Sequence, residues 1–172
     1  MKKLLSKLFE KSIELNDFTF SDDQIKKKWI GNPPTTKLII KEVEKKFGVK
    51  FPDDYKEMLL ISNGFPAVNN IEPTFEPIEN IIFYKDYEYS VIEIWRGMEG
   101  LDDEVENLKG SILIGGINGE QQFLLIPPKR KNDEWKYWKF ANWIPGEEEY
   151  DNLTKYLKSV TEFMENEINE NK

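Results

Sequence analysis

The sequence contains no cysteine and no histidine. Without cysteine the chain can form no disulfide and offers no thiol chemistry. The usual zinc and haem ligand sets need one or both of these residue types, so those sets are absent too. Histidine is the common general base near neutral pH, and Ser-His and Cys-His nucleophile systems depend on it. These two absences argue against most enzyme classes.

Short catalytic motifs are also missing. The sequence has no Gly-x-Ser-x-Gly nucleophile elbow and no phosphate-cradling glycine loop with its Lys-Ser/Thr pair. Two acidic runs, at 102–106 and 147–149, supply carboxylates, but neither has the alternating spacing of a calcium loop. We interpret both runs as solvated acidic surface, and we predict no catalytic residue, no metal and no cofactor.

A long apolar run is the third thing that the sequence lacks. No stretch approaches the roughly 18 uninterrupted apolar residues of a membrane span. The N-terminal segment has lysines ahead of leucines, as a signal peptide would, but Lys7, Glu10 and Lys11 interrupt it and no small-residue cleavage site follows. We therefore expect a cytoplasmic protein with no membrane partner.

Acidic residues outnumber basic ones, and the net charge is −8. An acidic surface repels nucleic acid and anionic membranes, so neither is expected as a partner. A basic protein would be attracted instead. Enzymes that cut nucleic acid are often basic because their substrate is a polyanion, so a basic nuclease fits this charge.

The clearest boundary in the 172 residues is the segment 31–34, Gly-Asn-Pro-Pro, because a helix does not run through a proline pair. It separates an N-terminal helical extension, residues 1–33, from a domain of residues 34–172. The chain is long enough for one well-buried core and short for two, so we expect a single globular domain overall.

The extension contains a predicted amphipathic helix at residues 2–15. Its predicted apolar face consists of Leu4, Leu5, Leu8, Phe9 and either Ser12 or Ile13. Such a helix either serves a partner or a membrane surface, or it docks on the domain. The stripe is short for stable anchoring in a membrane interface, which favours docking.

Residues 35–64 predict two short helices joined at a proline. The first has apolar residues at helical spacing, namely Leu38, Ile39, Val43 and Phe47. Gly48 supplies its stop, and Pro52 begins the second helix, because proline is tolerated at the first helical position. Tyr55, Met58 and Leu59 form the second apolar face, and an Asn-Gly pair ends it.

The order of residues in this segment resembles the signature of the SUKH superfamily. The matching residues are Glu44, Gly48, Phe51, Pro52, Tyr55, Leu59, Asn63 and Gly64, with Phe51 where leucine is commoner. Ser159 and Phe163 resemble the closing helix of the family, so the resemblance covers about residues 34 to 166. The superfamily includes fungal cell-wall assembly regulators and many bacterial immunity proteins of polymorphic toxin systems. The resemblance implies a protein-binding role and no enzymatic activity.

The middle of the chain predicts strands. Runs at 81–84 and 87–95 are dense in β-branched and aromatic residues and predict one hairpin. Runs at 111–116 and 122–126 flank an Asn-Gly turn and predict a second, and 135–140 predicts a further strand. We therefore expect an α+β fold, with a central, mainly antiparallel sheet flanked by the N-terminal helical hairpin and a C-terminal helix.

Aromatic and acidic residues near the ends of these elements are the candidate partner-binding residues. Trp, Tyr and Arg are the usual anchors of protein interfaces, and carboxylates would attract a basic partner. The candidates are Asp86, Tyr87, Glu88, Trp95, Arg96, Asp102, Asp103 and Glu104. A second aromatic group, Trp135, Trp138 and Trp143, fits a sheet core better than a sugar-binding platform, because aromatics alternate on both faces of that strand.

The leading hypothesis is an immunity-type binding protein that neutralises a cognate bacterial polymorphic toxin by stoichiometric binding. The alternative is a regulatory or scaffold module for protein interactions in a cell-wall or signalling pathway. A carboxylate-dependent glycosidase is the third hypothesis, and the absence of a paired-acid motif weighs against it.

Overall fold

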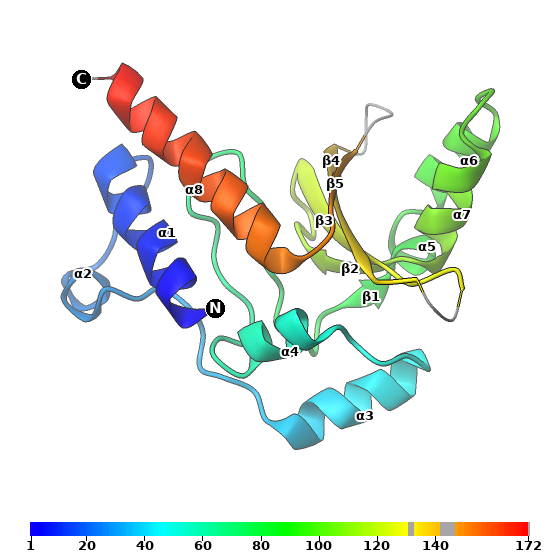
Figure 1. Ribbon diagram of the computed structural model, residues 1–172, viewed down its shortest axis with the longest axis horizontal. Coiled ribbons are helices and arrows are strands. Elements are labelled where there is room, and N and C mark those ends of the chain that lie inside the picture. The colour runs from blue at the N-terminus through cyan, green and yellow to red at the C-terminus, as the bar shows by residue number, and fades with distance from the viewer. Residues whose placement is uncertain (131–132, 142–146, 172) are drawn as a thin grey trace.

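The computed structural model describes residues 1–130, 133–141 and 147–171 (Figure 1). These parts contain eight helices and five strands. In chain order they are α1 (Lys2–Leu15), α2 (Asp22–Lys27), α3 (Lys37–Phe47), α4 (Asp53–Leu59), β1 (Ile82–Phe83), α5 (Tyr84–Tyr87), α6 (Tyr89–Arg96), α7 (Asp102–Gly110), β2 (Ile112–Gly115), β3 (Gln121–Ile126), β4 (Lys136–Ala141), β5 (Glu148–Tyr150) and α8 (Leu153–Glu170).

The five strands form one sheet in the order of the chain, β1-β2-β3-β4-β5, and every neighbouring pair is antiparallel. Helices lie on both sides of the sheet. The prediction of an α+β fold with a mainly antiparallel sheet is therefore confirmed. The hairpin of β2 and β3 and the strand β4 lie where the sequence predicted them.

Side chains alternate between the two faces of the sheet, as the strand period of two requires. Phe123, Leu125 and Tyr137 point to a core shared with α1, α4 and α8, and we call this side the α8 face. Leu124 and Trp138 point to a second core shared with α6 and α7, and we call this side the α7 face. In Figure 1 the two helical layers diverge, with β4 and β5 between them.

The helical hairpin of α3 and α4 has the local structure that its sequence predicted. Gly48 has a φ of 69° and ends α3. The buried carboxylate of Glu44 accepts a hydrogen bond from the Phe51 backbone N–H at 2.9 Å and pairs with Lys50 at 2.8 Å. Glu44 thus fixes the turn between the two helices, which is a structural role.

The Asn-Gly pair after α4 also has a structural role. The Asn63 side-chain oxygen accepts a hydrogen bond from the Ile78 backbone N–H at 2.8 Å. Gly64 has a φ of 85°, and a Cβ there would lie 2.7 Å from the Phe75 carbonyl oxygen. A glycine is therefore required where this loop approaches the following one.

Helix α1 docks on the domain rather than standing free. Leu5, Leu8 and Phe9 are buried, and α1 packs along α8 (Figure 1). The buried Ser12 hydroxyl donates a hydrogen bond to the Val68 carbonyl at 2.5 Å. The docking interpretation of the N-terminal stripe is correct. Within the described parts of the chain, no helix is long and apolar enough to cross a membrane.

Asp54 on α4 links this helix to β4 and α8. Its carboxylate accepts hydrogen bonds from the Tyr137 hydroxyl on β4 at 2.6 Å and from the Leu153 backbone N–H at the start of α8 at 2.7 Å. Charged acceptors make strong hydrogen bonds, so Asp54 fixes α4 against β4 and α8.

The predicted hairpin at 81–84 and 87–95 is wrong. Only Ile82–Phe83 is a strand, and the residues that follow form α5 and α6. Val91, Ile92 and Trp95 are buried at helical spacing on one side of α6. Helix α6 is rich in β-branched and aromatic residues, as strands are, so its composition led to a strand assignment. The acidic run at 102–106 lies in the helix α7.

Candidate protein-binding arm

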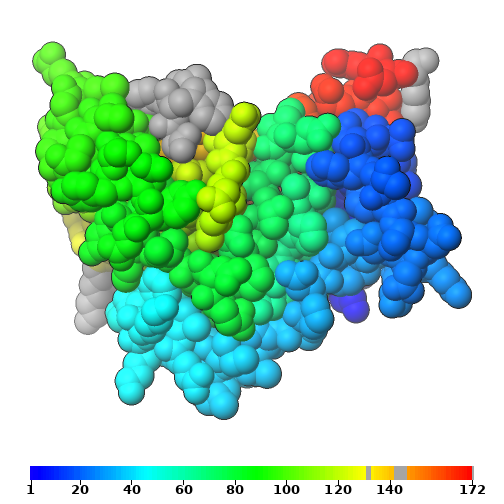
Figure 2. Space-filling model, turned by 180° about the vertical axis from the view of Figure 1, so that it is seen from behind, coloured from blue at the N-terminus to red at the C-terminus, as the bar shows by residue number. Residues whose placement is uncertain are grey.

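Helices α5, α6 and α7 form a lobe that we call the helical arm, residues 84–110. Figure 2 shows it in green at one side of the molecule, away from α1. The arm packs on the α7 face through a closed apolar core. That core contains Tyr84, Val91, Ile92, Trp95, Val105 and Leu108 from the arm, and Leu113, Leu124, Ile126, Trp138 and Phe140 from the sheet.

Polar contacts fix the base of the arm. The Tyr84 backbone N–H donates to the Ser111 carbonyl at 3.0 Å. The Tyr87 hydroxyl accepts a hydrogen bond from the Asn118 backbone N–H, in the turn between β2 and β3, at 2.8 Å. The arm is therefore attached at both the start of β2 and the turn before β3.

The arm is the acidic part of the molecule. It carries eight acidic and three basic side chains, so it contributes −5 to the net charge of −8. The acidic residues are Asp86, Glu88, Glu93, Glu99, Asp102, Asp103, Glu104 and Glu106. Charge of one sign gathered on one lobe raises the rate at which an oppositely charged partner arrives.

Apolar side chains are exposed among these charges. Tyr89 is 53 % exposed, Ile94 59 % and Met98 40 %, and all three lie on or just after the outer side of α6. Arg96 pairs with Glu93 on the same side. A hydrogen bond with Tyr89, followed by the charge of Glu93, raises the pKa of Arg96. Apolar anchors within a charged rim are the usual composition of a protein interface.

The arm brings the eight candidate residues of the sequence into one lobe. Asp86, Arg96, Asp102 and Asp103 are exposed, whereas Tyr87, Glu88 and Glu104 are half-buried. Trp95 is different, because it is 2 % exposed and its ring packs edge-on against Phe140. The expectation that the Trp95 ring anchors a partner is therefore wrong: the ring attaches α6 to the sheet.

Sequence reasoning missed the exposed residues of α6. Tyr89, Glu93 and Arg96 lie three or four residues apart and share one side of α6, and the exposed Ile94 lies on the same helix, with Met98 just after it. The helical period in this segment was the signal that could have found them. A strand assignment instead distributed them over two faces.

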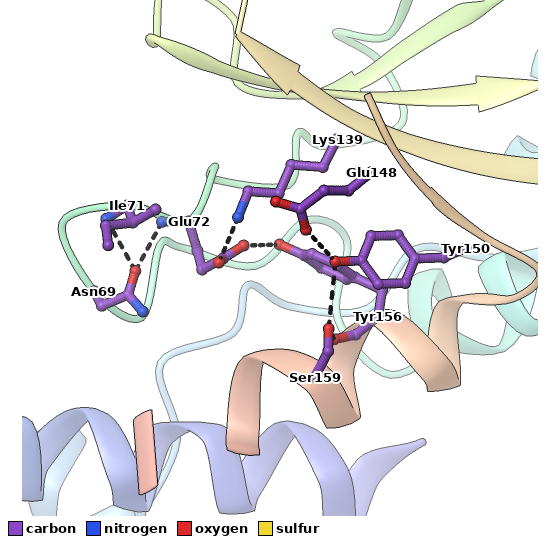
Figure 3. Close-up of polar contacts among 8 residues, drawn as sticks. All are labelled: Asn69, Ile71, Glu72, Lys139, Glu148, Tyr150, Tyr156 and Ser159. Carbon is purple, nitrogen blue, oxygen red and sulfur yellow. Dashed lines mark hydrogen bonds and ion pairs between the residues drawn. The ribbon is translucent and has the colours of Figure 1, made fainter. Parts of the chain in front are cut away.

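A second polar cluster lies on the α8 face (Figure 3). Glu72, which is buried, accepts hydrogen bonds from the Lys139 ammonium at 2.8 Å and from the Tyr156 hydroxyl at 2.5 Å. Burial, and then the Glu72 carboxylate, raises the pKa of Tyr156 well above its usual range. The Asn69 side-chain oxygen accepts the backbone N–H groups of Ile71 and Glu72, which orients that loop. Every charge in this cluster has a partner, which is the pattern of an internal structural network.

Two hollows lie elsewhere on the surface. One, of about 460 Å³, lies between residues 69–74 and the turn 116–121. The other, of about 520 Å³, lies between α3 and α4 and is lined by four lysines and three acidic residues. Among the described residues no group of three or more Asp or Glu side chains is arranged to hold a metal ion.

The tryptophans near β4 belong to the core where they are described. Trp138 is buried on the α7 face, and Tyr137 is buried on the opposite one. Trp135 is half-buried against the α8-face core. Trp143 lies outside the described residues.

The helical hairpin of α3 and α4, with its Gly48 turn and Pro52, lies in a part of the chain that matches a known family. The model of the SMI1 / KNR4 family (SUKH-1) matches residues 34–166. The chain belongs to the SUKH-1 family. The SUKH-1 match begins just before α3, includes the whole helical arm, and ends within α8. No curated protein is significantly similar to the chain.

SUKH-1 membership gives a coarse function. The family includes immunity proteins and the KNR4 cell-wall regulator, and it is a family of binding proteins. Helices α1 and α2 precede the matched residues, although α1 packs on α8 inside the match.

Proposed function

We propose that this SUKH-1 protein is an immunity-type binding protein that neutralises a cognate bacterial polymorphic toxin by forming a one-to-one complex. The observation that carries the proposal is the helical arm. It joins a net charge of −5 to the exposed apolar side chains of Tyr89, Ile94 and Met98.

Neutralisation works by occlusion. The acidic arm attracts the basic surface of the toxin and raises the rate of encounter. The apolar side chains of α6 then lose water in the interface and slow dissociation, because buried anchors supply most of the affinity. A tight inhibitory complex buries about 1,600 Å² in total, which an arm of three helices can provide together with its flanks.

A basic nuclease is the toxin class that fits this charge best. Such an enzyme holds a polyanion, so its catalytic cleft is positive. The arm would cover that cleft as a competitor of the substrate. Asp86 and Asp102 are exposed and have no ion pair among the described residues, so both are available for long-range attraction.

The test is a calorimetric titration of the protein with the purified toxin domain encoded beside it, at low and at moderate salt. We expect one-to-one binding at nanomolar strength that weakens with salt. No binding would overturn the proposal and would favour the regulatory or scaffold role that other family members have.

Association kinetics with charge-reversed variants then test the surface. The variant Asp86→Lys/Asp102→Lys should associate at least about tenfold more slowly at low salt, with the difference shrinking as salt is added. The matched control, Glu162→Lys/Glu170→Lys, makes the same charge change on the exposed side of α8. Equal slowing in both variants would mean that net charge, and not the arm, steers the partner.

A further inference from the structure

The sequence contains two Asn-Gly pairs, Asn63-Gly64 and Asn118-Gly119. Such a pair is chemically reactive, because the backbone nitrogen that follows an asparagine can attack the side-chain amide carbon of that asparagine. Glycine favours the attack, since it has no Cβ to obstruct the approach and its backbone reaches more conformations than that of other residues. The two pairs therefore share one intrinsic reactivity, and their surroundings in the fold distinguish them.

Asn63 is held at each of its polar groups. Its side-chain oxygen accepts a hydrogen bond from the Ile78 backbone N–H at 2.8 Å, and its side-chain nitrogen donates to Glu79 at 2.8 Å. Its backbone N–H donates to the Pro33 carbonyl at 3.2 Å, and its own carbonyl accepts from the Asn32 side-chain amide at 2.9 Å. The glycine that follows is buried. The amide carbon cannot turn toward that glycine without breaking these contacts, so the fold protects this pair.

Asn118 lies in the exposed turn between β2 and β3, which Figure 2 shows in yellow-green beside the arm. Its side chain makes no hydrogen bond to any described residue, and its backbone N–H donates to the Tyr87 hydroxyl at 2.8 Å. The Gly119 N–H donates to the Gly116 carbonyl at 3.0 Å. Opening this one turn bond frees the attacking nitrogen, and it uncovers no core because Asn118 and Gly119 are both exposed.

We propose that Asn118 is a site of spontaneous deamidation in the folded protein and that Asn63 is not. The Gly119 backbone nitrogen loses its proton to solvent base and bonds to Cγ of Asn118, while the Cγ–Nδ2 bond breaks and ammonia leaves. Water then opens the five-membered succinimide ring by adding to one of its two carbonyl carbons, and the bond from that carbon to the Gly119 nitrogen breaks. Addition at Cγ gives aspartate. Addition at the backbone carbonyl carbon gives isoaspartate, in which the main chain runs through the former side chain.

The modification changes the turn that holds the base of the arm. Both products add a carboxylate, next to Glu120 and beside the acidic arm, and isoaspartate also adds one carbon to the main chain of the turn. The same turn attaches the arm through the hydrogen bond from the Asn118 N–H to the Tyr87 hydroxyl. A longer turn no longer matches this contact, so the modified protein has a weaker attachment of its arm. This chemistry requires no partner and goes beyond the proposed function.

The experiment incubates the purified full-length protein in a mildly alkaline buffer at body temperature for several days and maps its peptides by liquid chromatography and mass spectrometry. Conversion of amide to acid changes the mass of a peptide, and isoaspartate and aspartate peptides separate by retention time. We expect the peptide with Asn118 to convert at least about tenfold faster than the peptide with Asn63, because only the first site reacts through a small local opening. The second peptide is thus an internal control.

The same incubation in denaturant separates the effect of the fold from that of the sequence. Without the contacts of Asn63, the two pairs should convert at rates within about threefold of each other. Comparable rates at Asn63 and Asn118 in the folded protein would overturn the proposal. A difference of the same size with and without denaturant would overturn it as well, since the fold would then not be the cause.

Two variants test the mechanism with the same measurement. Gly119 has a φ outside the left-handed region, and a Cβ there would meet no atom closer than 3.4 Å, so Gly119→Ala keeps the turn. It should slow the conversion of Asn118 at least about tenfold, because the new methyl group obstructs the attack. Tyr87→Phe removes the acceptor of the Asn118 N–H and should speed the conversion at least about twofold, because the turn opens more often. An unchanged rate in Gly119→Ala would overturn the reaction, and an unchanged rate in Tyr87→Phe would overturn the coupling of the turn to the arm.

Discussion

The two faces of the sheet both bury polar groups, and they differ in how their buried carboxylates are paired. On the α8 face, Glu72, Lys139 and Tyr156 satisfy one another at hydrogen-bonding distance. On the α7 face, Gln122 and Glu104 have buried polar atoms with no partner. Burial alone therefore does not mark a site for a partner. The Tyr55 hydroxyl and the Asn69 amide nitrogen on the α8 face are also unpaired, so the contrast lies in the carboxylates: Glu72 has a cation and a hydroxyl donor, and Glu104 Oε2 has neither.

Paired and unpaired buried groups contribute differently to the free energy of unfolding. A satisfied network contributes little net free energy but is costly to break, because removing one member leaves a charge without its partner. An unpaired polar atom costs about 1–3 kcal/mol in the free protein, and a partner that pairs it recovers that cost on binding. The Glu72 cluster is thus held by the chain's own side chains, whereas Gln122 and Glu104 keep the cost of their unpaired atoms in the free protein.

The largest effect is expected from Lys139→Met. This change leaves the buried Glu72 carboxylate without its cation, so we expect a loss of about 3–5 kcal/mol in the free energy of unfolding. Denaturant unfolding measures it. Lys136→Met on the same strand removes a more exposed ion pair and should cost less than about 1 kcal/mol. Similar losses in the two variants would show that the buried Lys139–Glu72 pair matters no more to stability than an exposed ion pair.

A smaller loss is expected from Tyr156→Phe, which keeps the packed ring but deletes the hydroxyl that donates to Glu72. We expect about 1–3 kcal/mol, because a buried carboxylate oxygen loses its donor. The half-buried Tyr150, whose hydroxyl donates to Glu148, provides the control Tyr150→Phe. If the control loses as much stability as Tyr156→Phe, the paired cluster is not the source of the effect.

On the α7 face we expect a substitution to raise the free energy of unfolding instead of lowering it. Gln122→Leu replaces an unpaired buried amide by an apolar group of similar size, so we expect the protein to gain about 1 kcal/mol. Gln121→Leu, one residue earlier and half-buried, should change stability by less than about 0.5 kcal/mol. A clear loss of stability in Gln122→Leu would show that the amide is satisfied after all.

The smallest expected effect is the change that Glu147 makes to the pH dependence of stability. The pKa of Glu147 is raised in the folded protein, first by burial and then by Glu104 and Glu149. A raised pKa stabilises the fold at low pH, below the unfolded value near 4.5, and this contribution disappears as pH rises through the folded pKa. Glu147→Gln should therefore gain stability over wild type on raising the pH from 4 to 7, by less than about 1 kcal/mol after solvent screening. Thermal unfolding across this range measures the difference; a gain that stays constant with pH would contradict it.

The sequence predicted the elements whose signals are local. The caps and turns at Gly48, Pro52 and Asn63, and the alternation on either side of Asn118, depend on neighbours a few residues away. The helices after Ile82–Phe83 were missed because their aromatic and β-branched composition matches a strand, and only packing on the sheet distinguishes the two.

The candidate site was predictable in its charge but not in its geometry. Carboxylates such as Asp102 are exposed, as the acidic run indicated. The burial of Trp95 depends on its contact with Phe140, which lies 45 residues later in the chain. The position of Gln122 depends on the register of β3 and β4 and on the arm that covers them. Such contacts between distant segments leave no local pattern in the sequence.

The packing of α1 on α8 has a consequence for how the chain folds in time. At synthesis rates of about 5–20 residues per second, roughly 7–30 s pass between the completion of α1 at Leu15 and the first residue of α8, Leu153. During that interval α1 has partners from earlier segments, such as Phe20 against Phe9, but lacks α8. The nascent chain therefore passes through a state in which the side of α1 that faces α8 is uncovered until the last helix is synthesised.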